Sequence, residues 1–329
     1  MTTLPLILIV TPAQRDANNG NWQTAWRWSH LLAGHYRTHI VSEWKAAQNS
    51  EAVAMLALHA RRSAPSVQAW AQAHPGRGLG VVLTGTDLYR DIEGDASAQR
   101  SLVLAQRLVV LQELGPRALP LAQQGKARVI FQSTTTRKTL TKSQRRLRAV
   151  MVGHLREEKS PQTLYQAARL LADRTDICID HIGAALDPGL GKQARQTAAA
   201  CPNYRWLGAL DHETTRRRIQ RAHLLIHCSR IEGGAHVLME AICSGTPVLA
   251  SGVDGNVGML GADYAGYFPW GDAAALAELL RRCRDEAQDS NGSTSILSRL
   301  QAQCRLRAPL FEPAAERAAL LTLLKDLTP

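Results

Sequence analysis

Short apolar runs alternate with longer amphipathic stretches from the first residues onward. In the first half, the runs at residues 6–10, 37–44, 53–59, 79–84, 108–111 and 128–131 have the length and the two-sided hydrophobicity of buried parallel strands. The stretches between them show the spacing of helices. This alternation predicts a doubly wound α/β fold. Ligands bind beyond the carboxyl ends of the strands in such sheets, so the residues after each strand are candidate site residues.

A polar and basic stretch at residues 133–148, STTTRKTLTKSQRRLR, is nearly free of apolar side chains and predicts a domain boundary. Strand and helix signals alternate again beyond it, with strands expected at residues 149–152, 177–182, 204–207, 222–228 and 247–250. We therefore predict one Rossmann-like domain over residues 1–140, a second over residues 141–309, and a helical tail over residues 310–329.

The formal net charge is +11, and most of the 39 basic residues are arginines. Arginine binds planar oxyanions through two parallel N–H groups, so this bias suits ligands that carry phosphate. Alternatively, arginines on helices, including residues 216–218, 281, 282 and 284, are simply solvated. The aromatic residues do not cluster with the arginine runs, which argues against a nucleic-acid partner.

No segment reaches the ~18 consecutive apolar residues of a membrane span, and the first residues lack the features of a signal peptide. The six cysteines form no C-x-x-C pair, which favours reduced, buried thiols over disulfides or zinc ligands. We expect a cytoplasmic protein that has small-molecule substrates, no structural metal and no stable membrane association.

Residues 229–251, SRIEGGAHVLMEAICSGTPVLAS, contain the densest grouping of residues whose types and spacing suggest a binding site. A loop and a helix over residues 235–244 are expected between two strands here. Gly233 and Gly234 would leave the first N–H groups of the helix uncovered, which predicts a phosphate site. Glu232 reaches the site from the loop, and Glu240 shares a helix face with His236. Because a carboxylate repels phosphate, we expect both glutamates to accept hydrogen bonds from sugar or ribose hydroxyls.

The loops after the third and fourth expected strands form a second candidate site. Two guanidinium groups beside a histidine would attract a small dianion, and hydroxyl groups next to a turn glycine would complete an anion pocket. The alternative is a helix start with solvated arginines. Asp87 is expected to cap the following segment, and Trp22, Trp26 and Trp28 are expected to pack rather than stack on a base. The predicted acceptor-binding residues are Arg61, Arg62, Thr84, Gly85 and Thr86.

The spacing E-x7-E with a glycine after the first Glu, followed by A-x-x-x-G-T-P-V-x-A-S, resembles the signature of the GT-B glycosyltransferases of family 4. This resemblance implies two Rossmann-like domains that face a central cleft. The N-terminal domain would hold the acceptor and the C-terminal domain the nucleotide-sugar donor, with the last helix returning to the N-terminal domain.

The same resemblance assigns roles on the donor side. Lys159 stands where the family has a lysine that binds the diphosphate. His154 replaces the family's arginine, so Arg156, two residues further on, is an alternative ligand for the phosphates. We expect Arg156, Lys159 and Glu232 to be catalytic. The other predicted donor-binding residues are Asn19, Gly20, His154, Gly208, Gly233, Gly234, Ala235, His236, Glu240 and Asn256; of these, Asn256 lies in a glycine-rich stretch, residues 251–261, that we expect to be a loop.

Seven stretches further resemble the selenosugar synthases of the selenoneine pathway, over almost the whole chain. They are NGNWQTAWRW, LHARRS, LTGTDLYRD, VGHLREEK, WLGAL, EGGAHV and GNVGMLGADYAGYFP. The resemblance implies transfer of a sugar from UDP-N-acetylglucosamine or UDP-glucose to selenophosphate, forming a carbon–selenium bond. An acceptor that is already anionic needs no general base, and the sequence offers no obvious one.

No D-x-D pair is present to bridge a metal and a diphosphate, so we expect no metal and no cofactor. Three alternatives remain: a family-4 enzyme with a hydroxyl or lipid acceptor, a nucleotide-sugar epimerase of the same fold, and a nucleic-acid binder.

Overall fold

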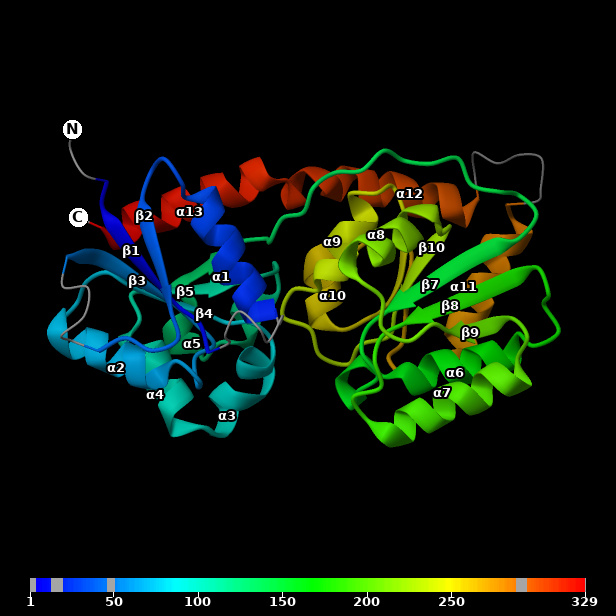
Figure 1. Ribbon diagram of the computed structural model, residues 1–329, viewed down its shortest axis with the longest axis horizontal. Coiled ribbons are helices and arrows are strands. Elements are labelled where there is room, and N and C mark those ends of the chain that lie inside the picture. Colours follow the sequence, from blue (N-terminus) through cyan, green and yellow to red (C-terminus); the bar gives the residue numbers. More distant parts are fainter. Residues whose placement is uncertain (1–3, 13–19, 46–50, 288–294, 329) are drawn as a thin grey trace. The chain divides into compact units, whose positions relative to one another are not determined.

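Two separate parallel sheets, each with six strands, organise the chain in this computed structural model (Figure 1). The structure describes residues 4–12, 20–45, 51–287 and 295–328. The chain divides into unit 1, Met1–Ser133 with Glu312–Pro329, and unit 2, Thr134–Phe311. The predicted class, two doubly wound α/β domains, is confirmed.

Unit 1 has the strand order β2-β1-β3-β4-β5-β6, and all pairs are parallel. The chain leaves β1 in one direction and returns to β3 on its other side, so the topological switch point lies between β1 and β3. The strands are β1 (Leu6–Val10), β2 (Arg37–Val41), β3 (Ala52–Leu58), β4 (Leu79–Val82), β5 (Arg107–Val110) and β6 (Ala127–Val129). The helices are α1 (Gly20–Leu31), α2 (Ala64–Ala73), α3 (Ile92–Gly94), α4 (Ala96–Leu104), α5 (Leu121–Gln124) and α13 (Pro313–Leu327).

Both faces of the unit 1 sheet are buried, as its uniformly apolar strands predict. Alternate residues of β1 point into two different cores, Leu8 into one and Ile9 into the other. Helices α2 and α4 cover the first face, where Trp70 and Leu102 pack. Helices α1 and α13 cover the second face, so the C-terminal helix is part of the first unit's core.

Glu316 on α13 ties several parts of unit 1 together. Its carboxylate is fully buried and accepts hydrogen bonds from Arg27, from the Trp28 indole at 2.7 Å, and from the backbone N–H of Ser133 at 2.8 Å. The Ser133 hydroxyl also donates to it, at 2.5 Å. A buried charge is stable only when it is compensated in this way.

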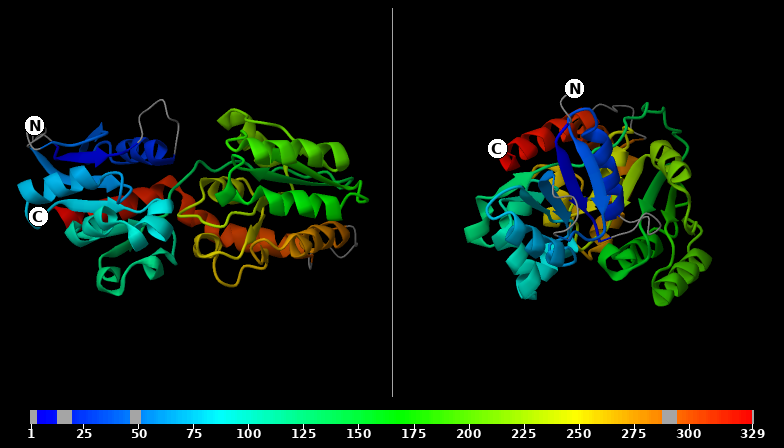
Figure 2. Two further views of the ribbon diagram at one scale, coloured as in Figure 1. Left: turned by 90° about the horizontal axis from the view of Figure 1, so that it is seen from below. Right: turned by 60° about the vertical axis from the view of Figure 1, so that its left-hand side comes forward.

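Unit 2 has the strand order β12-β11-β10-β7-β8-β9, again fully parallel. The chain moves outward from β7 through β8 and β9 and then returns to β10, so the switch point lies between β7 and β10. The strands are β7 (Leu147–Val152), β8 (Ile177–Ile182), β9 (Tyr204–Trp206), β10 (Leu224–His227), β11 (Val248–Ser251) and β12 (Tyr267–Phe268). The helices are α6 (Pro161–Leu170), α7 (Pro188–Ala200), α8 (His212–Arg221), α9 (His236–Ile242), α10 (Asp254–Leu260), α11 (Ala273–Asp285) and α12 (Ile296–Arg307). The strands of each unit lie between helices (Figure 2).

Several sequence expectations need correction. The glycine-rich stretch at residues 251–261 is not a loop throughout, because α10 forms within it. Trp28 is buried as expected, but Trp26 is half-exposed and contacts His30 instead of the core. Asp87 does not cap the segment after it; its carboxylate accepts from the preceding N–H groups of Thr84 and Gly85. All six cysteines are free thiols, as expected, but Cys178 is only half-buried, whereas the other five are buried.

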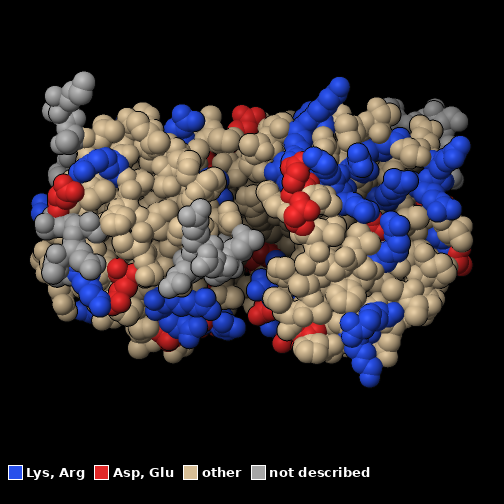
Figure 3. All heavy atoms as spheres, in the orientation of Figure 1, with Lys and Arg blue, Asp and Glu red and all other residues tan. Residues whose placement is uncertain are grey.

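The chain crosses from unit 1 to unit 2 at Ser133–Thr134 and returns at Phe311–Glu312, whereas the sequence placed these boundaries near residues 140 and 309. The polar stretch beyond the first crossing lies against unit 2. Its basic residues and those of α8 contribute to the Lys and Arg side chains that gather over this part of unit 2 (Figure 3). The exposed ones are Lys138, Arg145, Arg146, Arg148, Arg217, Arg218 and Arg221. Arg216 and Arg284 are buried, contrary to the expectation of solvated side chains.

Replacing Glu316 with Ala should lower the free energy of unfolding by about 3 kcal/mol, because it leaves buried donors without an acceptor. Urea unfolding followed by tryptophan fluorescence measures the change. Asp326→Ala is the control: Asp326 is a partly exposed partner of Arg107 and Arg128, and its loss should change stability much less than the loss of Glu316. Equal effects of the two changes would show that the Glu316 contacts are unimportant.

Candidate active site

The switch point of unit 2 brings two predicted donor residues together. The loop after β7 carries Lys159, and the loop after the adjacent strand β10 carries Glu232. Loops that leave a switch point in opposite directions open a crevice at the carboxyl ends of the strands. The Lys159 ammonium and the Glu232 carboxylate form a hydrogen-bonded ion pair here.

His227, the last residue of β10, places its Nε2 3.2 Å from the same Glu232 oxygen. Burial alone would raise the pKa of Glu232, but the charge of Lys159, together with the nearby His227 imidazole, outweighs it and holds that pKa well below its ordinary value. Burial lowers the pKa of His227. Lys159 is therefore the cation of this group, and a phosphate that binds Lys159 must share it with Glu232.

Contacts between neighbouring loops hold Lys159 in place. Ser160, the next residue, has a left-handed backbone with a φ of 46°. Its hydroxyl accepts a 2.9 Å hydrogen bond from the Trp270 indole. The Arg230 N–H donates to the Glu158 carbonyl at 2.8 Å, which joins the loop after β10 to the loop after β7. These contacts explain how a flexible lysine can be held at one point.

Glu240 lies on the second turn of α9 and is buried. Its Oε1 contacts His212 Nε2 at 2.6 Å, His236 Nδ1 at 3.3 Å and the Arg216 guanidinium at 3.7 Å. Burial raises the pKa of Glu240, yet the hydrogen bonds with the two histidines and the positive charges around it bring that pKa to about 2. The carboxylate is ionised at neutral pH, as an acceptor for a ribose hydroxyl must be.

His154 is an uncharged group in the loop after β7. Its Nδ1 accepts a 3.0 Å hydrogen bond from the N–H of Ala184. Burial and the charges of Arg156 and Lys159 lower its pKa, so it adds no positive charge at pH 7. Arg156 is exposed, and among the described residues no carboxylate lies within 4 Å of it. Of these two residues, Arg156 is the one that can supply a second cation.

Two glycines allow the loops of unit 2 to approach closely. A Cβ on Gly183, after β8, would lie 1.9 Å from the Gly153 carbonyl oxygen. A Cβ on Gly255 in α10 would lie 2.0 Å from the Glu232 carbonyl oxygen, so the backbone of Glu232 rests directly on α10. The sequence showed the glycines but not this role.

The other predicted donor residues of unit 2 have mixed environments. The Ala235 N–H, expected to be uncovered, donates to the Met259 sulfur at 3.1 Å. Asn256 is buried and its amide donates to Ser251, while its Oδ1 has no partner among the described residues. Gly208 has a φ of 69° in the turn after β9 and accepts from the Gly183 N–H. Gly233 is buried, whereas Gly234 and His236 are half-buried.

Unit 1 has its own cluster after β3 and β4, where the acceptor residues were predicted. Arg61 is 41% exposed, and its Nε donates to Asp91 at 2.9 Å. Asp87 is fully buried and joins the two loops, because it accepts from the N–H groups of Ala60, Thr84 and Gly85. The predicted pocket thus contains two acids as well as arginines.

Three unusual features lie together in this cluster. His59 has a φ of 73°, a left-handed conformation that is uncommon for a residue with a side chain. Residues Asp87–Asp91 form a π-helical turn, a feature that is frequent at functional sites. His59 Nε2 is buried and has no hydrogen-bond partner among the described residues; the nearest oxygen of Asp91 is 3.8 Å away. Arg62 and Thr86 lie in these loops, Arg62 exposed and Thr86 half-buried.

The predicted loop after β1 is described only in part. Asn19 lies outside the described residues. Gly20 is the first residue of α1, and its carbonyl accepts a 2.8 Å hydrogen bond from the Thr24 hydroxyl.

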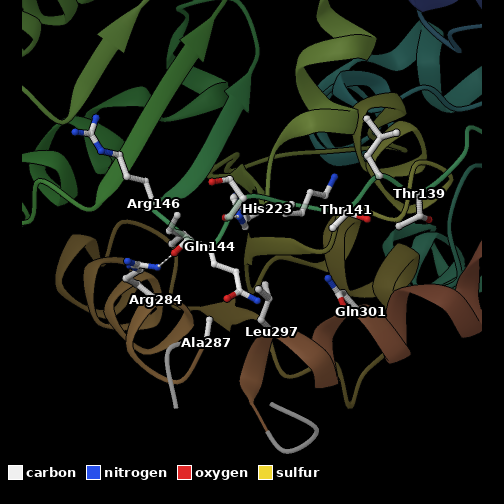
Figure 4. A pocket seen from close by; sticks show the side chains of 13 residues that line it. Thr139, Thr141, Gln144, Arg146, His223, Arg284, Ala287, Leu297 and Gln301 are labelled. Carbon is white, nitrogen blue, oxygen red and sulfur yellow. Dashed lines mark hydrogen bonds between the residues drawn. The ribbon is translucent and has the colours of Figure 1, made fainter. Parts of the chain in front are cut away.

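A pocket of about 400 Å³ lies in unit 2 where the stretch after the first crossing passes α11 and α12 (Figure 4). Its basic groups serve internal contacts. Arg284 donates to the Gln144 carbonyl, Lys142 to the Gln220 carbonyl, and His223 contacts the Ser143 carbonyl. Arg146 points away from the other labelled side chains in Figure 4. These contacts attach the stretch to unit 2.

Within the described residues, no group of three His, Cys, Asp or Glu side chains is arranged to hold a metal ion. None of the described helices is long and apolar enough to cross a membrane.

Comparisons with known proteins match this architecture. Residues 132–291 match the family model for glycosyl transferases group 1. No curated protein sequence matches the chain. Among solved structures, HepE of Anabaena in complex with UDP superposes with a TM-score of 0.72 at 16% identity, covering 99% of this chain and 100% of that one.

Two further structures are similar to this chain. Sucrose-phosphate synthase from Thermosynechococcus elongatus has a TM-score of 0.73 at 16% identity, covering 98% of this chain and 99% of that one. The pneumococcal O-GlcNAc transferase GtfA in complex with UDP and GlcNAc has a TM-score of 0.65 at 18% identity, covering 83% and 57%. At these identities the likeness concerns the fold.

The two parallel sheets and these neighbours define the GT-B fold, as predicted. The match to the glycosyl transferases group 1 model covers residues 132–291, which lie almost entirely in unit 2. The site at the β7/β10 switch point lies within the matched region.

Sequence reasoning missed the partners of the two glutamates. His227 was part of an apolar run, and His212 and Arg216 lie more than twenty residues before Glu240. The burial of Arg216 could have been predicted from its spacing, because it lies one turn before the buried Ile219 on the inward face of α8.

Replacing Gly255 with Ala should reduce glycosyltransferase activity at least about 10-fold, because the new methyl group displaces Glu232 and small misplacements have large effects on turnover. Gly252→Ala is the matched control, since a Cβ there meets only ordinary contact, 3.6 Å from the Phe268 carbonyl oxygen. Full activity of the Gly255 variant would mean that the position of Glu232 is unimportant.

Proposed function

We propose that the chain is a selenosugar synthase, which transfers a sugar from UDP-N-acetylglucosamine or UDP-glucose to selenophosphate. The observation that carries this proposal is the resemblance of seven stretches to that family. These stretches include the segments that bear Lys159 and Glu232 in unit 2 and Arg61 and Thr84 in unit 1. They therefore coincide with the candidate sites of both units.

The donor assignment is supported by the site at the switch point of unit 2. Lys159 would bind the diphosphate together with Arg156, Glu240 would accept from the ribose, and Glu232 would accept from the sugar hydroxyls. The solved structures of HepE and of the pneumococcal O-GlcNAc transferase hold UDP. By analogy we assign UDP as the nucleotide here.

The acceptor assignment is supported by the chemistry of the loops after β3 and β4. Arg61, Arg62, Thr84 and Thr86 offer guanidinium and hydroxyl donors that suit a tetrahedral oxyanion. His59, the histidine of these loops, is only 3% exposed, and burial lowers its pKa. It is poorly placed to take a proton from an alcohol, and this favours an acceptor that is already anionic.

In the proposed reaction, selenium attacks the anomeric carbon and the carbon–oxygen bond to UDP breaks, so the electron pair leaves on UDP. Lys159 and Arg156 would stabilise that departing charge. The loops of unit 1 would hold the phosphate so that selenium points at the sugar.

The direct test is to incubate the protein with UDP-N-acetylglucosamine or UDP-glucose, with and without selenophosphate, and to measure released UDP. Release that depends on selenophosphate is expected. Release that instead requires an alcohol or lipid acceptor would identify a different group 1 glycosyltransferase, and interconversion of the sugar without acceptor would identify an epimerase.

Lys159→Ala and Glu240→Ala should each lower kcat/KM for the UDP-sugar roughly 10- to 1,000-fold, the first by removing a cation from the diphosphate and the second by removing a ribose acceptor. Lys192→Ala and Glu213→Ala, at exposed positions, are the matched controls. Unchanged kinetics in both site variants would refute the donor assignment.

Arg61→Ala and Arg62→Ala should raise the KM for selenophosphate at least about 10-fold, while the KM for the UDP-sugar changes little. Arg100→Ala on α4, an exposed arginine, serves as control. If both variants keep the normal dependence on selenophosphate, these arginines are a solvated helix start and the acceptor binds elsewhere.

Activity should survive EDTA, because Lys159, Arg156 and backbone N–H groups can meet the charge of the diphosphate without a metal. Loss of activity that Mg²⁺ restores would contradict this prediction.

A further inference from the structure

Arg216 is buried in unit 2 although its neighbours on α8 are exposed. Its residue exposure is 2%, whereas the side chains of Arg217 and Arg218 are largely solvated. Taking a guanidinium out of water costs several kcal/mol unless charged or polar partners compensate it. The contacts of Arg216 should therefore show what holds it there.

The guanidinium of Arg216 lies between two functional parts of the chain. On one side its NH1 is 3.7 Å from Glu240 Oε1, and among the described residues Glu240 is its only carboxylate partner within 4 Å. On the other side NH1 donates to the Thr134 hydroxyl and NH2 donates to the Thr135 carbonyl at 2.8 Å. Its Nε is buried without a partner among the described residues.

Thr134 and Thr135 are the first residues of unit 2 after the chain leaves unit 1. The Thr134 N–H donates to the Phe311 carbonyl at 3.0 Å, so the outgoing and returning crossings are hydrogen-bonded to each other within unit 2. Arg216 thus connects the first crossing segment, residues 134–135, to the carboxylate that we assign to the ribose.

His212 and Arg216 differ in how they can respond to a ligand. The His212 side chain is 74% exposed and can turn into solvent when a hydroxyl group takes its place on Glu240. Arg216 has no such freedom, because it is enclosed and bonded to the crossing segment. A ribose that binds Glu240 would replace the histidine and leave the arginine in contact.

We propose that Arg216 is a positioning residue that couples Glu240 to the first crossing segment, so that a nucleoside diphosphate bound at Glu240 restrains residues 134–135. This inference rests on the proposed donor role of Glu240. Arg216 touches neither substrate nor reacting atoms in this account; it acts through Glu240 on one side and through the Thr134 hydroxyl and the Thr135 carbonyl on the other.

Hydrogen–deuterium exchange of the full-length protein, with and without saturating UDP, tests the coupling. In the wild type, UDP should slow exchange at residues 134–135 at least about threefold, since ligand binding stabilises the segments coupled to it. Thr134→Val removes the hydroxyl that accepts from Arg216, and Arg216→Lys removes the second donating arm. Both should abolish this protection, and Thr134→Ser, which keeps a hydroxyl, should retain it.

The dissociation constant of UDP, measured by calorimetry, separates positioning from binding. For Thr134→Val it should stay within about twofold of the wild-type value while the protection is lost, because the change lies beyond Arg216 from Glu240. Protection that persists in both Thr134→Val and Arg216→Lys would overturn the coupling. A wild type that binds UDP without slower exchange at these residues would also overturn it. A wild type that fails to bind UDP at all would instead overturn the donor assignment.

Discussion

The ion pair between Lys159 and Glu232 is the contact on which the proposed donor site depends. The Glu232 side chain is only 11% exposed, and its carboxylate stays ionised because Lys159 supplies the compensating charge. The pair forms because the strand order of unit 2 places the loops after β7 and β10 side by side at the switch point. Gly255 then lets α10 support the backbone of Glu232. Fold and electrostatics thus fix one cation and one acceptor at the edge where a nucleotide sugar is expected.

The fold could be predicted from sequence because it is recorded in local patterns, and the same kind of pattern gave the donor motif as a hypothesis. Apolar runs of strand length predicted the strands of both sheets. The predicted strand ends lie up to three residues too late: the strand expected at residues 37–44 ends at Val41. The spacing of Glu232 and Glu240 and the position of Lys159 identified the donor residues as a hypothesis. The strand order, which brings these residues together, depends on contacts between distant segments and could not be read from these patterns.

The partners of the key side chains were harder to predict, because burial is decided by tertiary packing. Residues 216–218 are three consecutive arginines, yet only Arg216 is buried. In unit 1 the sequence offered arginines and hydroxyls but gave no sign that Asp87 would join two loops or that His59 would adopt a left-handed backbone. An uncommon backbone conformation of this kind persists only where the surrounding structure holds it in place, and it often marks a functional site.

The central claim, transfer of a sugar to selenium, is tested most directly by NMR of the product formed from UDP-sugar labelled with ¹³C at the anomeric carbon and from selenophosphate enriched in ⁷⁷Se. The account predicts a one-bond coupling between the anomeric ¹³C and ⁷⁷Se, which can arise only if a carbon–selenium bond has formed. A product in which the anomeric carbon is bonded to oxygen, with no coupling to selenium, would contradict it.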